Sequence, residues 1–302
     1  MSYLGYQELS KTYTASLGSG VDLVITGMAS ISTNHPLENL FTRNLGTFCR
    51  FKTVATWLTI TVTNNGAIPS NYKGKTLNLI GILGHSLEDT NYIKVITSYR
   101  SRSDVTQFVT VHDPVDKFNS IILGNREDAH KVPYKVVIEV HQGTPNADID
   151  IGRLWVGPLW DTGDPSTQGV KNLINEGWVL GMAQGAKSDL TVGNQSYSND
   201  FRPFKTLDFT MEIDDTDELF GEGQNSFLEE TSLFGMVNHL EGGGECMVQI
   251  RDLNGPYDTT NSEDKRWRNI VGIYAESNAA AHKVKHGKAN QFSVDFKLRE
   301  LL

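Results

Sequence analysis

Apolar and polar residues alternate along short segments over most of the chain. Trp57–Thr63 alternates apolar residues with threonine, and Phe292–Leu298 alternates apolar with polar residues near the C-terminus. This period of two predicts half-buried β-strands. Leu77–Leu83 is almost continuously apolar, which predicts a strand buried on both faces. Further strands are predicted at Val21–Ile25, Tyr92–Tyr99, Phe108–Val111, Ser120–Leu123, Tyr134–Val140, Ile149–Gly157, Trp178–Leu180, Leu190–Val192, Leu207–Ile213, Cys246–Ile250 and Asn269–Tyr274.

One segment favours a helix over a strand. Ser226–Leu240 carries apolar residues near the i, i+3, i+4 spacing, and the run Gly242–Gly244 predicts its end. The short strands are separated by Gly, Pro, Asn and Asp every ten to fifteen residues or so, a spacing typical of antiparallel sandwiches. The predicted fold is therefore mainly β: an antiparallel β-sandwich followed by a second β-rich domain with one helix.

Composition shifts predict the domain boundaries. Residues 1–20 show no period and are interpreted as an extended N-terminal arm, and residues 161–169 read as a linker rich in Asp, Gly and Pro. The β-sandwich domain then spans 21–160 and the second domain spans 161–302. Residues 1–160 carry 14 basic and 13 acidic side chains, whereas 161–302 carry 13 and 23. The acidic character belongs to the second domain, which would suit a basic partner surface.

The overall composition excludes several classes of protein. The 302 residues are 38% hydrophobic and carry a formal net charge of −9, which indicates a folded globular chain and argues against a nucleic-acid partner. No window is apolar enough for a membrane span, and no signal peptide is visible at the N-terminus. Cys49 and Cys246 cannot form a disulfide framework and are interpreted as buried, idle thiols of a protein folded in a reducing cytoplasm.

No cofactor or metal is predicted. The phosphate-binding glycine motifs are missing. His282 and His286 would share one face if 279–286 were helical, but three lysines surround them and no third ligand accompanies them, so a solvated loop is favoured. The acidic run Asp214–Glu218 lacks the spacing of a calcium loop and is interpreted as a charged loop.

Candidate chemistry is sparse elsewhere. Asp148 and Asp150 alternate on one predicted strand and would flank a glycosidic bond in a hydrolase, although paired acids on an exposed strand face are far commoner. Trp155 and Trp160 bracket the joint between the two domains. They form either a platform on which a glycan stacks or, as we favour, a packed interface between domains. His85 is interpreted as a loop residue at the end of a strand.

Three stretches together carry a resemblance to a known class of protein. They are His35–Arg43, Leu77–Leu87 with its Gly-His-Ser-Leu end, and Ile149–Trp160 with its Ile-Gly-Arg-Leu-Trp-Val-Gly-Pro run. In this order and spacing they resemble minor structural proteins of long-tailed bacteriophages, whose first domain is similar to a galactose-binding-like, discoidin-type β-sandwich. The closing segment Phe292–Leu301 looks like the last strand of phage tail and tail-tip modules.

The resemblance implies an architectural function without catalysis. The chain would be a tail-tip or baseplate component that assembles, in the cytoplasm of the host bacterium, with its own copies and with neighbouring tail proteins into a virion. The alternative is a module that binds host-surface glycan, with Trp155, Trp160, His85 and Arg153 as candidate interaction or glycan contacts. A lesser alternative is a polysaccharide-degrading enzyme that uses Asp148 or Asp150.

Overall fold

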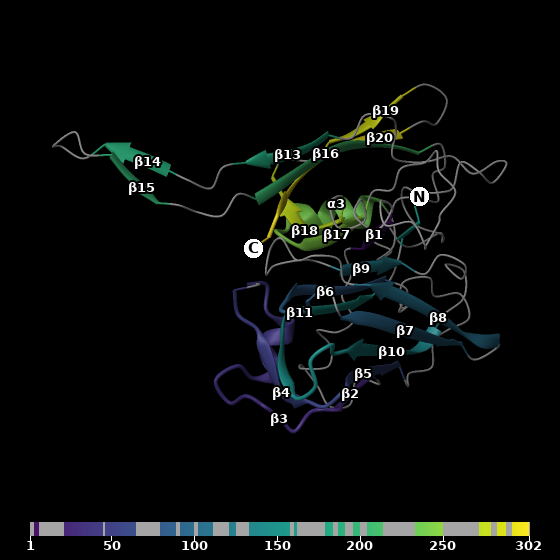
Figure 1. The fold of residues 1–302 in the computed structure, drawn as a ribbon. Helices are drawn as coiled ribbons and strands as arrows, with labels where there is room; N and C mark the ends of the chain where they lie inside the picture. Colours follow the sequence, from purple (N-terminus) through teal and green to yellow (C-terminus); the bar gives the residue numbers. More distant parts are fainter. Residues whose placement is uncertain are drawn as a thin grey trace.

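Strands dominate the fold (Figure 1). The computed structural model describes residues 3–5, 21–44, 46–64, 79–88, 91–99, 102–110, 121–124, 133–157, 160–161, 179–183, 187–190, 196–199, 204–213, 233–249, 272–278, 283–287 and 292–301. Every strand pairing among these residues is antiparallel. Their one α-helix is too short to cross a lipid bilayer. The mainly β prediction is confirmed.

Two five-stranded sheets form a β-sandwich. The first, the outer sheet, has the order β2 (Val21–Thr26), β5 (Trp57–Asn64), β10 (Pro133–His141), β7 (Tyr92–Tyr99) and β8 (Arg102–Thr110). The second, the middle sheet, has the order β3 (Ser30–Ile31), β4 (Cys49–Val54), β11 (Ala147–Gly157), β6 (Leu79–His85) and β9 (Ile121–Gly124). The short 3-10 helix η1 (Leu37–Phe41) precedes β4. This confirms the antiparallel sandwich.

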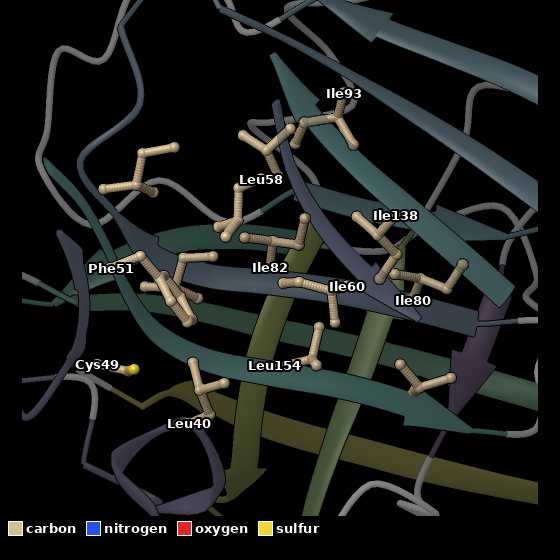
Figure 2. Packing of buried hydrophobic residues seen from close by; sticks show 14 of the residues in the cluster. Leu40, Cys49, Phe51, Leu58, Ile60, Ile80, Ile82, Ile93, Ile138 and Leu154 are labelled. Atoms are coloured by element: carbon tan, nitrogen blue, oxygen red, sulfur yellow. The ribbon is translucent and has the colours of Figure 1, made fainter. Parts of the chain in front are cut away.

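The sandwich core lies between these two sheets (Figure 2). The alternation in β5 places Leu58 and Ile60 on the inner face, where both are fully buried. Ile80, Ile82 and Leu154 meet them from the middle sheet. Burial of each such side chain contributes about 1.5–3 kcal/mol. The threonines between the apolar residues of β5 face outward and are only partly buried.

A third, eight-stranded sheet covers the other face of the middle sheet. Its order is β12 (Trp160–Asp161), β1 (Tyr3–Gly5), β17 (Glu245–Gln249), β18 (Gly272–Ser277), β20 (Phe292–Glu300), β16 (Phe204–Ile213) and β13 (Val179–Ala183), with β19 (Val284–His286) beside β20. A separate hairpin of β14 (Lys187–Leu190) and β15 (Ser196–Asn199) lies apart from the three layers (Figure 1).

The helix α3 (Leu233–Glu241) packs on the eight-stranded sheet. Met236, Val237 and Leu240 join a core that includes the stacked rings of Phe209 and Phe296. The helix ends where the glycine run predicts, with Gly243 at a φ of 77°. A glycine accepts this left-handed conformation at the C-terminal end of a helix without steric cost. The first part of the predicted helix, 226–232, lies outside the described residues.

The expected N-terminal arm is partly ordered by its own chain. Tyr3–Gly5 forms β1 between β12 and β17, with Leu4 opposite Trp160 on one side and Val248 on the other. Residues 6–20 lie outside the description. Since a piece of the arm and residues 160–161 both join the third sheet, the division at residues 20 and 160 stays a prediction.

The middle sheet is buried on both faces. Leu154 and Val156 of β11 belong to the sandwich core, whereas Arg153 and Trp155 point the other way, toward β17 and β18. On β6, a methyl group added to Gly81 would overlap the sulfur of Met247 in the third sheet. Such close contact explains the continuous apolar run in β6, and the prediction of a strand buried on both faces is confirmed.

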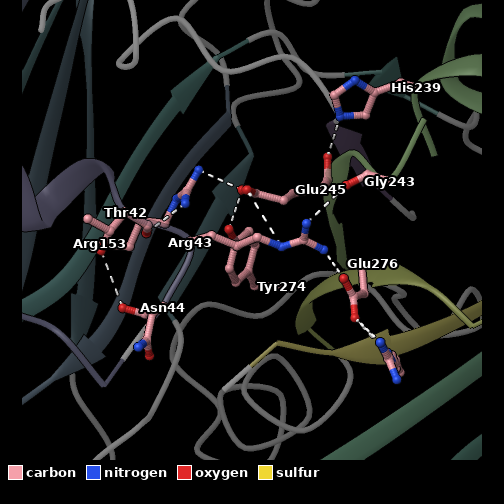
Figure 3. Close-up of polar contacts among 10 residues, drawn as sticks. Thr42, Arg43, Asn44, Arg153, His239, Gly243, Glu245, Tyr274 and Glu276 are labelled. Atoms are coloured by element: carbon pink, nitrogen blue, oxygen red, sulfur yellow. Dashed lines mark hydrogen bonds and ion pairs between the residues drawn. The ribbon is translucent and has the colours of Figure 1, made fainter. Parts of the chain in front are cut away.

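A buried ion pair joins the middle sheet to the third sheet (Figure 3). The fully buried guanidinium of Arg153 lies 2.6 Å from the Glu245 carboxylate and donates a 2.7 Å hydrogen bond to the Thr42 carbonyl. Its carbon atom lies 5.4 Å from the ring centre of Trp155 and 5.0 Å from that of Tyr274. The charge is therefore paired, hydrogen-bonded and covered by two aromatic rings.

Further polar contacts extend this junction. The Tyr274 hydroxyl donates to Glu245. Arg43 donates a 3.0 Å hydrogen bond to the Gly243 carbonyl and pairs with Glu276, which also accepts a 2.6 Å hydrogen bond from Arg299 (Figure 3). The two contacts of Arg43 join distant parts of the chain and require the sandwich and the third sheet to be docked, whereas the Tyr274 and Arg299 contacts lie within the third sheet.

We expect Arg153→Met to destabilise the protein by about 3–5 kcal/mol, because it leaves the buried Glu245 carboxylate without its main counter-ion. Urea unfolding measures this loss. The double variant Arg153→Met/Glu245→Gln should lose less than the sum of the two single variants. Arg299→Met, at a half-exposed arginine, is the control and should cost less than about 1 kcal/mol. Equal losses for Arg153→Met and Arg299→Met would contradict this account of the junction.

Candidate functional site

A cleft opens at one end of the sandwich. Two segments that pass between the sheets form it: the one after β6 and the one that joins β10 to β11. Its volume is about 140 Å³. The described residues that line it are Ser86, Leu87, Glu88, Asn91, Gln142, Thr144, Ala147, Asp148 and Ile149. The cleft is thus small and mostly polar, which suits part of a small polar ligand.

Hydrogen bonds fix the wall of the cleft that follows β6. The side chain of Asn91, which is 5% exposed, accepts a 2.7 Å bond from the Glu88 amide and donates a 2.9 Å bond to the His141 carbonyl. Ser86 and Asp150 exchange two bonds, of 3.0 Å and 2.9 Å. Both segments of the cleft are therefore tied together before any ligand arrives.

The start of β11 forms the opposite wall and pairs with a bulge in β4. Lys52 and Thr53 of β4 face the single residue Asp148, and Thr53 has a φ of 54°. This left-handed conformation is strained for a β-branched residue, and Asp148 stabilises it by accepting a 3.0 Å bond from the Thr53 amide. Asn146, one residue before the lining residue Ala147, also has a positive φ, of 62°. Such strained positions concentrate at functional sites.

Gln142 lines the cleft and has a buried side-chain acceptor. Its main-chain amide donates to the Thr56 carbonyl at 3.0 Å, and the residue is only 8% exposed. Its side-chain oxygen Oε1 is buried and has no hydrogen-bond partner among the described residues. An unsatisfied buried acceptor costs about 1–3 kcal/mol, and a ligand that donates a hydrogen bond would recover part of that cost.

The charged side chains in the cleft are both acidic. Glu88 and Asp148 are exposed and line it. The neighbouring Arg50 is bound to Asp150 by two hydrogen bonds of 2.7 Å and 2.8 Å, and this contact raises the pKa of the guanidinium. Among the described lining residues, Glu88, Asp148 and Gln142 therefore provide the cleft with hydrogen-bond acceptors.

Three aromatic rings stand next to the cleft. Trp57, His141 and Tyr92 lie opposite one another on β5, β10 and β7, on the outward face of the outer sheet. The Tyr92 and His141 rings are stacked at 4.4 Å, and Trp57 meets them edge-on at 5.3 Å and 4.7 Å. Tyr92 follows the lining residue Asn91 and His141 precedes the lining residue Gln142, so the chain runs directly from this partly buried aromatic row into the two segments that form the cleft.

Three of the four residues that the sequence suggested as interaction or glycan contacts are buried in the structure. Trp155, Arg153 and His85 are at most 1% exposed, because β6 and β11 belong to the middle layer. His85, predicted to lie in a loop, is the last residue of β6. Trp155 contacts Tyr274 in the third sheet, which agrees with the packing alternative. Trp160 lies in β12, and its side chain is outside the description.

The carboxylates considered for catalysis have structural partners. Asp150 is held by Arg50, and Asp148 supports the bulge at Thr53. The sequence pattern pointed to Asp148 as a residue of interest but gave no indication of Gln142, which lies in a segment of turn-forming composition. A single glutamine in such a segment carries no periodic signal, so only the fold reveals its burial.

The histidine pair does not have the geometry considered for a metal. His286 lies in strand β19 rather than in a helix, and His282 is outside the described residues, as is Asp214–Glu218. Across the described part of the chain, no group of three potential metal ligands gathers. Cys49 and Cys246 are buried, and burial raises the pKa of each thiol to about 12. The prediction of buried thiols is confirmed.

Comparison with known proteins finds similarity only among solved structures. No protein family matches the sequence, and no curated protein matches it. A fucosidase from Ruminococcus gnavus in complex with fucose is 10% identical with a TM-score of 0.33, and the match covers 50% of this chain and 28% of the fucosidase. This chain therefore spans less than a third of that enzyme.

Two of the similar structures are separate sugar-binding modules. The lectin domain of lectinolysin, in complex with Lewis b, is 9% identical with a TM-score of 0.32, over 46% of this chain and 92% of that domain. A fucose-binding module from Streptococcus pneumoniae is 13% identical with a TM-score of 0.30, over 45% of this chain and 90% of the module.

His85 makes the stability of the fold depend on pH. Burial lowers its pKa to about 4, whereas the pKa in an unfolded chain is about 6.5. The unfolded chain therefore takes up the proton first, and the fold loses up to about 3 kcal/mol as the pH falls from 6.5 to 4. We expect His85→Asn to make the free energy of unfolding depend less on pH between 6.5 and 4. The asparagine retains an acceptor for the Leu87 amide. His286→Asn is the exposed control. An unchanged slope in His85→Asn would contradict the assignment.

Proposed function

We propose that this protein binds glycans in the cleft at the end of the sandwich. The observation that carries the proposal is the buried, unpartnered Oε1 of Gln142 in a cleft that Glu88 and Asp148 also line. Sugar hydroxyls are compact donors, and a ring with several of them can reach these acceptors together. An amide and two carboxylates that converge on a small cleft match this pattern of donors.

The neighbouring aromatic row supports the same ligand class. Sugar rings have apolar C–H faces as well as hydroxyl edges, and partly exposed aromatic rings provide a surface for those faces. Trp57 and Tyr92 are half-buried on the outward face of the outer sheet, next to the hydrogen-bonding wall at Asn91. A glycan seated in the cleft would have this row beside it.

We propose binding without hydrolysis. An acid–base pair in a glycosidase needs two carboxyl groups that face the same bond with different affinities for a proton. In this protein Asp150 is engaged by Arg50 through both carboxylate oxygens, and Asp148 is engaged by the Thr53 amide. Both carboxylates therefore have structural roles around the cleft. We expect the protein to release no reducing sugar from the glycans that it binds.

Gln142→Met tests the binding site. The substitution keeps a similar volume but removes the acceptor, so we expect affinity for a glycan to fall by about 10–100-fold, equivalent to about 1–3 kcal/mol. The melting temperature should be unchanged or higher, because an unsatisfied buried oxygen disappears. A glycan array identifies the ligand and titration calorimetry measures the affinity. Asn238→Ala, at an exposed position on α3, is the control.

Two results would overturn the proposal. The first is a folded protein that binds none of the glycans on a broad array. The second is a Gln142→Met variant that binds its glycan as tightly as the native chain while Asn238→Ala also behaves normally.

We propose assembly as a second function, in line with the resemblance to phage tail-tip proteins. The specific observation is β13, the last strand in the order of the eight-stranded sheet. Val179 and Met182 in this strand are 62% and 65% exposed, and Val179–Ala183 contains no charged residue. Uncharged, apolar edge strands pair readily with a strand of another chain. A further copy of this chain would extend the sheet in a virion subunit.

Met182→Lys tests the assembly function. A lysine on an edge strand opposes pairing with a second chain, so we expect the dissociation constant of self-association to rise about tenfold or more. Sedimentation velocity over a range of concentrations measures this change. Val24→Lys, at a 53% exposed position on the edge strand β2, is the matched control and should leave association unchanged. A native chain that stays monomeric at every concentration would count against assembly through β13.

A further inference from the structure

We infer that the cleft selects glycans by charge: it accepts neutral and amino sugars and rejects uronic and sialic acids. The inference rests on the glycan-binding function proposed above and specifies its substrate class. It starts from three of the described lining side chains whose oxygens accept hydrogen bonds: Glu88, Asp148 and Gln142. The Gln142 oxygen is buried and has no hydrogen-bond partner among the described residues, so the cleft has a buried polar atom in addition to its two surface acids.

Two of the nearby positive charges are engaged in ion pairs. A third, Lys52, is exposed opposite Asp148 at the bulge of β4 and is not among the described residues that line the cleft. The Arg50 guanidinium donates two hydrogen bonds to Asp150, on the strand that carries Asp148. Lys94, two residues after Tyr92 on the outward face of β7, forms a 2.8 Å ion pair with Glu139. Neither arginine nor lysine is among the described residues that line the cleft. A ligand carboxylate seated there would therefore meet two like charges, and no cation among those lining residues would compensate them.

The hydrogen-bonding pattern leads to the same selection. An ionised carboxylate accepts hydrogen bonds and donates none, and the Gln142 oxygen also only accepts. A neutral sugar offers several hydroxyl donors, and an amino sugar adds an ammonium group with three. A uronic acid replaces one hydroxymethyl donor by a further acceptor. It therefore loses a hydrogen bond and adds repulsion, whereas the ammonium group gains a charge-assisted bond.

Matched monosaccharides test this selectivity on the full-length protein. The probes are the methyl glycosides of glucose, glucosamine and glucuronate, and those of galactose, galactosamine and galacturonate. NMR titration measures each dissociation constant at low salt and again at about 0.5 M salt, where screening acts over only a few ångströms. In the series that binds, we expect the uronate to bind at least about tenfold more weakly than the neutral sugar, and the amino sugar at least as tightly. The advantage of the amino sugar should shrink at high salt.

The double variant Glu88→Gln/Asp148→Asn identifies the source of the selection. An asparagine at 148 keeps an oxygen for the Thr53 amide, so the bulge that shapes the cleft can persist. We expect the variant to bind the uronate and the neutral sugar within about threefold of each other, since the repulsion is gone. Glu212→Gln, at an exposed acid on β16 in the third sheet, removes a charge elsewhere and should retain the native discrimination.

The outcomes separate this inference from the function on which it rests. Equal binding of uronate and neutral sugar by the native chain overturns charge selection but leaves glycan binding intact. Discrimination that persists in the double variant also overturns it, because the two carboxylates would then not be the cause. If none of the six probes binds and the glycan array is likewise negative, glycan binding itself fails and charge selection fails with it.

Discussion

The arrangement of the three layers depends on the buried charge of Arg153. A guanidinium removed from water is stable only when a carboxylate and hydrogen-bond acceptors surround it. Here Glu245 comes from the third sheet and the Thr42 carbonyl from the segment before β4, 111 residues away from Arg153 in the sequence. The charge is therefore satisfied only when the sandwich and the third sheet are docked in this one orientation, with Trp155 and Tyr274 packed around it.

The same strand connects this junction to the cleft. β11 begins at the bulge beside Asp148 and continues to Arg153 and Trp155 between the layers. Its second half is buried on both faces, so it forms a fixed support for the loops at its start. The cleft is consequently placed on strand ends rather than on a long free loop. A small site with preset acceptors gains from such support, because less conformational freedom is lost when a ligand binds.

Much of the fold was predictable because strand periodicity is a local property. The alternation of Trp57–Thr63 and of Phe292–Leu298 predicted β5 and β20, and the glycine run after Leu240 predicted the end of α3. The same pattern misplaced His85, and for Trp155 it favoured packing between domains while leaving a glycan platform as the alternative. Whether the second face of a strand meets solvent depends on which layer covers it, and that layer comes from a distant part of the chain. The cleft was missed for the same reason, because it forms where two separate connections meet.

The sequence by itself thus determined the strand-rich antiparallel class, most strand positions, the helix end and the two buried thiols. These follow from nearest-neighbour periodicity, turn chemistry and composition, which act over a few residues. The tertiary structure alone decided that Arg153, Trp155 and His85 are interior, that Tyr3–Gly5 joins a sheet of its own chain, and that Gln142 enters a cleft with Glu88 and Asp148. These properties depend on contacts between residues far apart in the chain, and packing of whole layers fixes them.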